Sequence, residues 1–177
     1  MVKVSKQLGS LDISKWIEFD ITQEDIRKAK LRRQLIDNAV PLEYQQFNSE
    51  YRWIGHLGED KFEEVVKKTT YETDKPIGHK DILDFKINNK TIDIKTNKIN
   101  IHPANTSHNY KFLILKAQFD SKRIDYYVAI TLFLEIMKGW FCGWIPYNEV
   151  IIYPTINHGY GLSYAIPFSD LHPMINN

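Results

Sequence analysis

Alternating apolar and polar positions predict a β-hairpin near the middle of the chain. Apolar side chains fall at Leu83, Phe85 and Ile87, and again at Ile92 and Ile94, on either side of a polar break at residues 88–89. Period-two alternation on both sides of such a break is typical of two antiparallel strands joined by a short turn. The hairpin is the strongest local pattern in the sequence, and the other predicted elements are placed around it.

The turn determines which polar side chains of the hairpin face one another. If residues 88–89 form the turn, Asp84 lies opposite Asp93; if residues 89–90 form it, Asp84 faces Lys95 and Lys86 faces Asp93. In both registers the two carboxylates and Lys95 share one face, whereas a three-residue loop would separate them. Asparagine tolerates the positive φ that tight hairpin turns need, which favours a two-residue loop.

Two helices are predicted before the hairpin. Thr22 and Asp25 have the spacing of a capping box, and Ile21 and Ile26 that of a hydrophobic staple, so a helix is expected to begin here and run to about residue 39. A second helix is expected over residues 51–68. It carries an apolar stripe with Glu59 on its edge; the stripe contains Gly58, Phe62, Val65 and Val66.

The remainder of the chain predicts further strands separated by loops. Residues 124–132 are rich in β-branched and aromatic side chains and are the best candidate for a central strand. The other expected elements are a strand or arm near 16–19, loops over 69–80 and 97–109, a strand or buried helix over 110–115, strands over 139–145 and 163–166, a short element of open type over 148–153, and a C-terminal turn or helix capped by Ser169. The pattern predicts one α/β domain with a mixed central sheet flanked by helices.

Composition and charge narrow the class of protein. With 177 residues the chain is expected to form one domain, and residues 1–50 are interpreted as a helical extension packed on a core of residues 51–177. A net charge of only +1 means that an anionic partner must be bound by a local patch. The single cysteine, Cys142, excludes an intrachain disulfide and is expected to be a buried, inert thiol. No apolar run suits a signal peptide or a membrane span, so a cytoplasmic protein is expected.

Three motifs follow one another along the chain: GHLGEDKFEEVV (55–66), DFKINNKTIDIKT (84–96) and, less specifically, IDYYVAI (124–130). In this order the chain resembles the PD-(D/E)XK nuclease superfamily, whose members share the restriction-endonuclease-like fold. The resemblance covers roughly residues 51–133 and departs from the family name in having no proline before Asp84. Asp81, three residues earlier, is an alternative to Asp84, but its odd offset places it on the opposite face of a strand.

The resemblance implies a metal-dependent phosphodiesterase site. Asp84 and Asp93 would ligate Mg²⁺, or Mn²⁺ as a substitute, together with the backbone carbonyl of Ile94, and Lys95 would be the catalytic lysine. Glu59 would be the carboxylate of the first helix, either holding a metal-bound water or pairing with Lys95 as a structural acid. Oxygen ligands suit Mg²⁺, which keeps several waters and needs few protein carboxylates.

The implied partner is DNA, double-stranded or branched. Lys86 lies on the Asp84 face of its strand and is a candidate phosphate contact, with a plain surface lysine as the equal alternative. The basic residues of the first helix form either a DNA-backbone patch or a solvated face; they are Arg27, Lys30, Arg32 and Arg33. Cutting both strands would require a homodimer.

We therefore expect a divalent-metal-dependent DNA endonuclease with a restriction-endonuclease-like fold. The first alternative is a non-catalytic nucleic-acid-binding module with the same fold, and the second is an unrelated interaction protein whose hairpin mimics the pattern. RNA stays open as a substrate, because nothing in the sequence reads a 2′-hydroxyl.

Overall fold

The computed structural model describes residues 9–39, 52–68, 85–159 and 161–174. Its helices and strands, in chain order, are β1 (Ile17–Asp20), α1 (Gln23–Ala39), α2 (Trp53–Lys68), β2 (Phe85–Ile87), β3 (Lys90–Lys98), β4 (Lys111–Leu115), α3 (Lys116–Ser121), β5 (Tyr126–Phe133), β6 (Lys138–Pro146), α4 (Tyr147–Val150), β7 (Thr155–Asn157) and β8 (Leu162–Pro167). Short 3-10 turns cover Pro103–Asn105, Leu134–Ile136 and Phe168–Asp170. The protein is of the α/β class, as predicted.

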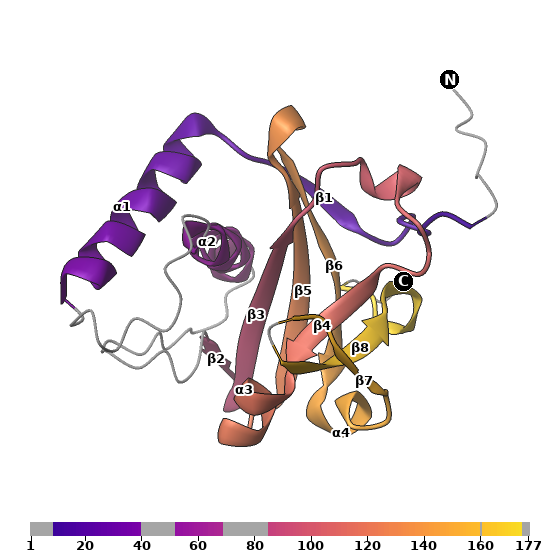
Figure 1. Cartoon of the computed structure of the whole chain (residues 1–177). Coiled ribbons are helices and arrows are strands. Elements are labelled where there is room, and N and C mark those ends of the chain that lie inside the picture. Colours follow the sequence, from indigo (N-terminus) through magenta and orange to yellow (C-terminus); the bar gives the residue numbers. More distant parts are fainter. Residues whose placement is uncertain (1–8, 40–51, 69–84, 160, 175–177) are drawn as a thin grey trace.

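The strands form two sheets. The larger has five strands in the order β1-β6-β5-β3-β2, and the smaller has three in the order β4-β8-β7. In the larger sheet β3 and β5 run parallel, while the other neighbours are antiparallel, so the predicted mixed sheet is present. The segment between β3 and β5 contains β4 and α3, and it crosses one face of the larger sheet (Figure 1).

The larger sheet separates two hydrophobic clusters. Helices α1 and α2 lie together on one of its faces, and the three-stranded sheet covers the other (Figure 1). Successive residues of β5 alternate between the clusters: Tyr127 and Ala129 face the three-stranded sheet, whereas Val128 and Ile130 face the helices. Because both faces are covered, β5 is apolar along nearly its whole length. This continuous apolar run is the reason why the sequence predicts a central strand here.

The start of α1 follows the predicted capping box. The Thr22 backbone N–H donates to Asp25 Oδ2 (2.8 Å), and the Asp25 N–H donates to Thr22 Oγ1 (3.1 Å). Ile21 is buried and Ile26 partly buried in the cluster beneath the helices, as the hydrophobic staple predicts. Lys61 of α2 reaches Asp25 (2.7 Å) and fixes one helix against the other.

Several sequence predictions need correction. The strands after residue 110 do not all join one sheet, since β4, β7 and β8 form a second sheet. The expected loop over 97–109 is shorter, because β3 continues to residue 98, and the helix α3 was not predicted at all. Val65 was assigned to the buried stripe of α2 but is 40% exposed, because α2 contacts the sheet through Phe62 and Val66 instead. Residues 1–50 contain more than a helical extension, since β1 belongs to the larger sheet.

Candidate functional site

The hairpin that carries the candidate site closes with a two-residue turn. Asn88 and Asn89 have φ of 49° and 63°, and Ile87 pairs with Lys90. This confirms the first of the two predicted registers and excludes the three-residue loop. Asp84 and its alternative Asp81 lie outside the described residues, so the position of Asp84 opposite Asp93 stays a prediction.

Asp93 and Lys95 come together on the face of β3 that points away from α2. Asp93 is only 3% exposed, and the Lys95 ammonium lies 2.9 Å from its Oδ2 atom. Lys95 also donates to Gln118 Oε1 of α3 (3.1 Å), and Lys122, directly after α3, has its ammonium 4.0 Å from the same carboxylate oxygen. One buried carboxylate is therefore faced by two ammonium groups, which offset the cost of burying its charge.

Asp125 fixes β3 in register with β5 beneath this cluster. Its Oδ2 accepts hydrogen bonds from the backbone N–H (2.9 Å) and the hydroxyl (3.0 Å) of Thr91. The Thr91 N–H bond is the main reason why the pKa of the Asp125 carboxyl lies below its ordinary value of 3.8. The clamp ties the start of the strand that carries Asp93 to the start of β5.

Tyr127 is the neighbour of Asp93 in the parallel pairing of β3 and β5. The side chain is 1% exposed, and its hydroxyl has no hydrogen-bond partner among the described residues. Burial first, and then the nearby charge of Asp93, raises the pKa of Tyr127 above its ordinary value of 10.0, so the phenol stays protonated. A neutral polar group thus lies beside the buried carboxylate.

Further along β3, a chain of hydrogen bonds connects the two sheets. Thr131 of β5 donates to Asn97 Oδ1 (2.9 Å), and the Asn97 amide donates to the hydroxyl of Tyr110 (2.6 Å), just before β4. The thiol of Cys142 donates to Thr131 at 3.3 Å, and burial raises its pKa to about 12. Cys142 is therefore buried and unreactive near neutral pH, as the sequence predicted.

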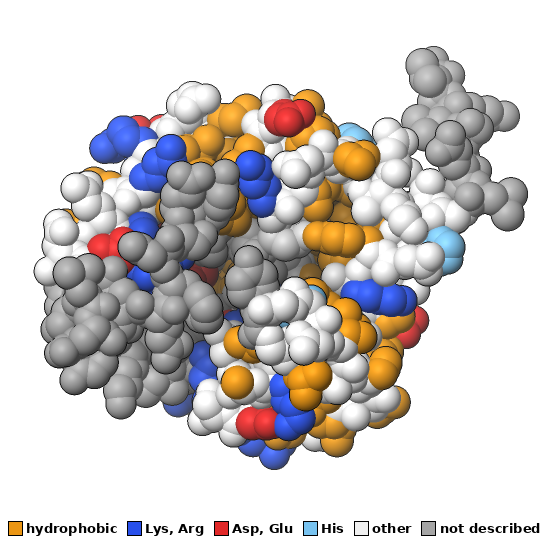
Figure 2. Space-filling view, in the orientation of Figure 1, with side chains coloured by type: hydrophobic (Ala, Val, Ile, Leu, Met, Phe, Trp, Pro, Cys, Tyr) orange, Lys and Arg blue, Asp and Glu red, His pale blue; other side chains and the backbone are white. Residues whose placement is uncertain are grey.

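A recess of about 180 Å³ opens between β3 and β4 beside Lys95. We call it the β3–β4 recess; among the residues that line it are Lys95, Asn97, Tyr110, Lys111, Leu113 and Phe168. Figure 2 shows a hollow near the centre of the face that is turned toward the viewer in Figure 1. A second hollow, of about 460 Å³, lies where α2 begins, with Arg52 and Lys98 among its lining residues.

Glu59 is not brought to Asp93 and Lys95. It lies on α2, which packs on the other face of β3: a Cβ on Gly58 would touch Thr96, and Ile94 belongs to the same apolar cluster as the helix. Glu59 instead pairs with Arg32 of α1 at 2.5 Å and lies 3.7 Å from His56.

The environment of Glu59 is that of a structural acid. Burial by itself would raise the pKa of the carboxyl, but His56 and Arg32 outweigh burial and hold it below 4.5. Pairing with Lys95, one of the two predicted roles, does not correspond to a contact of Glu59 among the described residues, whereas the role of holding a metal-bound water stays a prediction.

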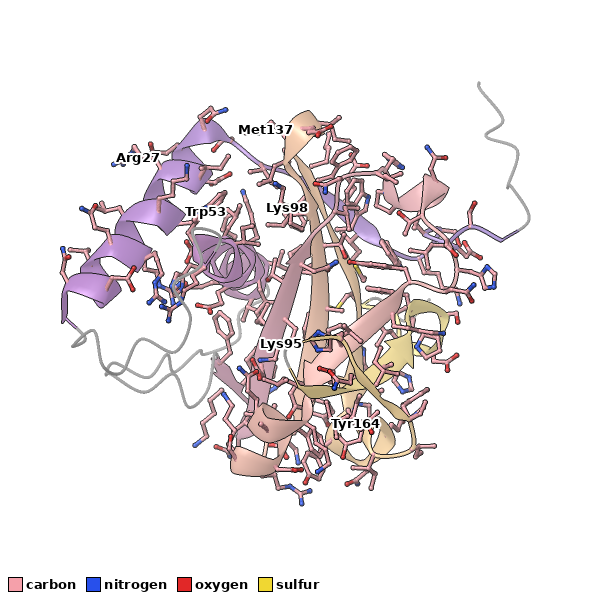
Figure 3. All side chains as sticks on the ribbon, in the orientation of Figure 1. Arg27, Trp53, Lys95, Lys98, Met137 and Tyr164 are labelled. Atoms are coloured by element: carbon pink, nitrogen blue, oxygen red, sulfur yellow. The ribbon has the colours of Figure 1, made fainter. Side chains whose placement is uncertain are left out.

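The basic residues of α1 are engaged within the helical layer. Arg32 pairs with Glu59 and Asp60, and Arg33 pairs with Asp37. Arg27 binds Glu24 one turn earlier, and Lys30 lies 5.0 Å from the centre of the Trp53 ring. Figure 3 shows Arg27 on α1 and Lys95 on β3 well separated, with α2 between the helix and the strand. These contacts favour the interpretation of α1 as a largely structural, solvated surface.

Lys86 keeps the position that the sequence assigned to it. It pairs with Thr91 across the hairpin, so it shares the face of Asp93, and it is exposed. It forms no ion pair with the described part of the chain.

Three residues of the cluster were missed by the sequence reasoning: Gln118, Lys122 and Tyr127. Gln118 lies on α3 and Lys122 directly after it, four residues apart and shortly before the candidate central strand. That spacing was the available signal, but α3 was not recognised as a helix.

The described residues contain no group of three or more His, Cys, Asp or Glu side chains placed to hold a metal ion. The predicted ligand set needs Asp84 as well as Asp93 and the Ile94 carbonyl, and Asp84 is not described. Carboxylate and carbonyl oxygens are the donors that Mg²⁺ prefers, so the chemistry of the set fits this ion. The buried Asp93 is the one predicted carboxylate ligand that the structure describes.

Comparison of the chain with protein-family models, with curated proteins and with solved structures gives no match. Among its described residues, the protein has no helix with the length and apolar character needed to cross a membrane.

Proposed function

We propose that this protein is a divalent-metal-dependent DNA endonuclease with a restriction-endonuclease-like core. The observation that carries the proposal is the buried Asp93 carboxylate, held 2.9 Å from the Lys95 ammonium on the face of β3 that borders a recess. A module that only binds nucleic acid needs exposed cations and has no need for a buried carboxylate among them.

The order of the elements supports the same proposal. A helix (α2), a tight hairpin (β2 and β3), a crossover that contains α3, and a parallel buried strand (β5) follow one another. This order matches the α/β arrangement that the resemblance implies, with the acid-x-Lys sequence on the second hairpin strand. The fold-level part of the proposal rests on this order together with the sequence motifs.

Hydrolysis of a phosphodiester needs an attacking water, relief of charge on the non-bridging oxygens and a stabilised leaving oxygen. Asp93, with Asp84 and the Ile94 carbonyl, would hold a Mg²⁺ ion, which when bound polarises a phosphate and acidifies water. Lys95 lies next to Asp93 and would orient the water and neutralise negative charge that develops on the phosphate.

Residues on α3 and directly after it would support the proposed site. Gln118 accepts a hydrogen bond from Lys95 and limits the positions that its ammonium can adopt. Lys122 supplies a second positive charge near Asp93, which would attract the substrate phosphate to this face.

A cleavage assay tests the proposal. Plasmid, linear duplex, single-stranded and branched DNA, and a matched RNA, are incubated with Mg²⁺ or Mn²⁺, with an EDTA lane beside them. We expect metal-dependent cutting that Asp93→Ala and Lys95→Ala each abolish. Asp120→Ala and Lys116→Ala, which break an ion pair along α3, are matched controls and should cut normally.

The failures of this assay are informative. Binding without cutting would leave the alternative of a non-catalytic nucleic-acid-binding module. Neither binding nor cutting would leave an interaction protein whose hairpin mimics the pattern. Paired cuts in both strands would require two sites, and sedimentation of the protein with DNA would then test for the homodimer that we propose for this case.

A further inference from the structure

The β3–β4 recess adjoins Lys95, and the proposed hydrolysis does not itself require it. It lies between the two sheets: β4 is an edge strand of the smaller sheet, and β3 belongs to the larger. Lys95 and Asn97 border it from β3, and Lys111 and Leu113 border it from β4.

The size of the recess restricts what it can hold. Sites for complete drug-sized ligands measure roughly 300–1,000 Å³, whereas the recess measures about 180 Å³. It can therefore admit one group of a larger molecule whose remainder lies outside. A free cofactor or a whole nucleotide chain would not be enclosed.

The chemistry of its walls indicates an anionic group joined to a flat, partly apolar one. Two lysines, Lys95 and Lys111, are among the residues that line it, and Lys111 forms no ion pair with the described residues. Leu113 and Phe168 give it an apolar side, while Asn97 and Tyr110 bring polar groups into it. A sugar and base with an attached phosphate have this combination of properties.

The burial of Asp93, next to the recess, favours unpaired over paired nucleic acid as the ligand. The Asp93 side chain is 4% exposed and the Lys95 side chain 25%, so a phosphate must enter the surface to reach them. A duplex keeps its bases stacked inside a stiff rod, and enzymes that need access to one nucleotide take it out of the stack at an energetic cost. A single strand can bend and place one unstacked nucleotide in a recess without that cost.

We infer that the β3–β4 recess binds one unpaired nucleotide next to the phosphate that is cut, and that the protein acts on single-stranded or branched nucleic acid. The inference rests on the proposed nuclease function and specifies its substrate. Lys111 contacts the phosphate that flanks the bound nucleotide, and Leu113 lies against its sugar or base.

Binding in EDTA tests the inference without cutting. A short fluorescein-labelled DNA strand, the same strand in a duplex, a branched duplex and an RNA of equal sequence serve as probes in anisotropy titrations. We expect the single strand and the branch to bind more tightly than the duplex, and the RNA arm shows whether the 2′-hydroxyl matters. Leu113→Trp, which fills the recess, should weaken single-strand binding roughly fivefold or more.

Lys111→Ala provides a second variant that leaves the packing of the core intact. It should reduce the slope of log affinity against log salt by about 0.7, the contribution of one phosphate contact to a single strand. Lys116→Ala, which removes the same charge from the neighbouring helix outside the recess, should leave single-strand binding unchanged. Thermal melting of each variant verifies folding.

The outcomes separate this inference from the nuclease proposal. Equal binding of duplex and single strand, or normal single-strand binding by a folded Leu113→Trp variant, overturns the inference even if the protein cuts DNA in Mg²⁺. Recess-dependent binding of the single strand without cutting overturns the nuclease proposal and keeps the binding site. Failure to bind any of the four probes in EDTA overturns the inference, and the nuclease proposal is then decided by the cleavage assay in Mg²⁺ alone.

Discussion

The two faces of β3 lie in different environments, one apolar and one charged. Toward α2, the strand presents Ile92 and Ile94, and ion pairs on that side, such as Glu59 with Arg32, join the two helices. Toward α3, it presents Asp93 and Lys95, which border a recess. Because side chains alternate along a strand, neighbouring residues only one position apart belong to different environments.

The difference between the faces shows what distinguishes a structural acid from a candidate catalytic one. Both Glu59 and Asp93 are buried, at 9% and 3% exposure. Glu59 is enclosed by partners from α1 and α2, so its charge serves helix packing. Asp93 is paired with Lys95, which lines the β3–β4 recess. Burial alone therefore does not separate the two acids; what differs is whether the partner of the acid lines a recess.

The largest expected effect comes from exchanging each acid for its amide. Asp93→Asn should lower the cleavage rate at least about a hundredfold, because the carboxylate charge is needed for the proposed chemistry. Glu59→Gln should leave the rate close to that of the wild type but lower the free energy of unfolding by about 1–3 kcal/mol. Cleavage kinetics and urea unfolding measure the two quantities. A folded but inactive Glu59→Gln variant would return Glu59 to the active site.

A smaller effect is expected from the contact that closes the α2 face. A Cβ at Gly58 would lie 1.9 Å from Thr96 Oγ1 and 2.9 Å from its Cβ, so rotation of Thr96 cannot fully relieve the clash. Gly58→Ala should therefore cost about 1–3 kcal/mol of stability.

Gly55, one turn earlier on the same helix, is the matched control. Nothing lies within 4 Å of a Cβ there, so Gly55→Ala should be neutral or stabilise the protein by up to about 1 kcal/mol through helix propensity. Urea unfolding of both variants gives the sign. Equal effects at the two glycines would mean that α2 does not approach β3 at Gly58.

On the Asp93 face, two tyrosines should respond with opposite signs to loss of their hydroxyls. The Tyr127 hydroxyl is buried without a partner in the described chain, so Tyr127→Phe should raise the free energy of unfolding by about 1 kcal/mol. Tyr110 accepts a 2.6 Å hydrogen bond from Asn97, so Tyr110→Phe should lower it by about the same amount. Destabilisation by Tyr127→Phe would instead show that this hydroxyl binds a water beside Asp93.

The hairpin and the central strand could be predicted because their signals are local. Alternation located β2 and β3, the positive φ that asparagine tolerates favoured a two-residue turn without deciding between its two registers, and the apolar run over 124–132 marked β5. Each of these features depends on residues close together in sequence, where periodicity and turn chemistry decide the structure.

The partners of the site could not be predicted, because they depend on contacts distant in sequence. Lys95 and Gln118 are 23 residues apart, and Glu59 and Arg32 are 27 apart. The sequence shows that Glu59 borders an apolar stripe, but not that α1 supplies its cation. The helix α3 has only 6 residues, too few for a clear 3.6-residue period.

The smallest expected effect concerns the clamp that serves both faces of β3. The pKa of Asp125 lies below 3.8 in the folded protein, so its charge stabilises the fold above this pH, and the contribution is lost as the pH falls through the folded value. Asp125→Asn keeps the shape and should cost about 0.5–1 kcal/mol near pH 7. Urea midpoints measured from pH 7 to pH 3 should show this difference constant at first and shrinking below about pH 4.

Asp120→Asn, at an exposed pair on α3, is the control for a general effect of charge on acid stability. A difference between Asp125→Asn and the wild type that persists unchanged to pH 3 would show that the carboxylate charge does not hold the Thr91 N–H. In that case the parallel pairing of β3 with β5 would suffice to place Asp93 on one face and Ile94 on the other.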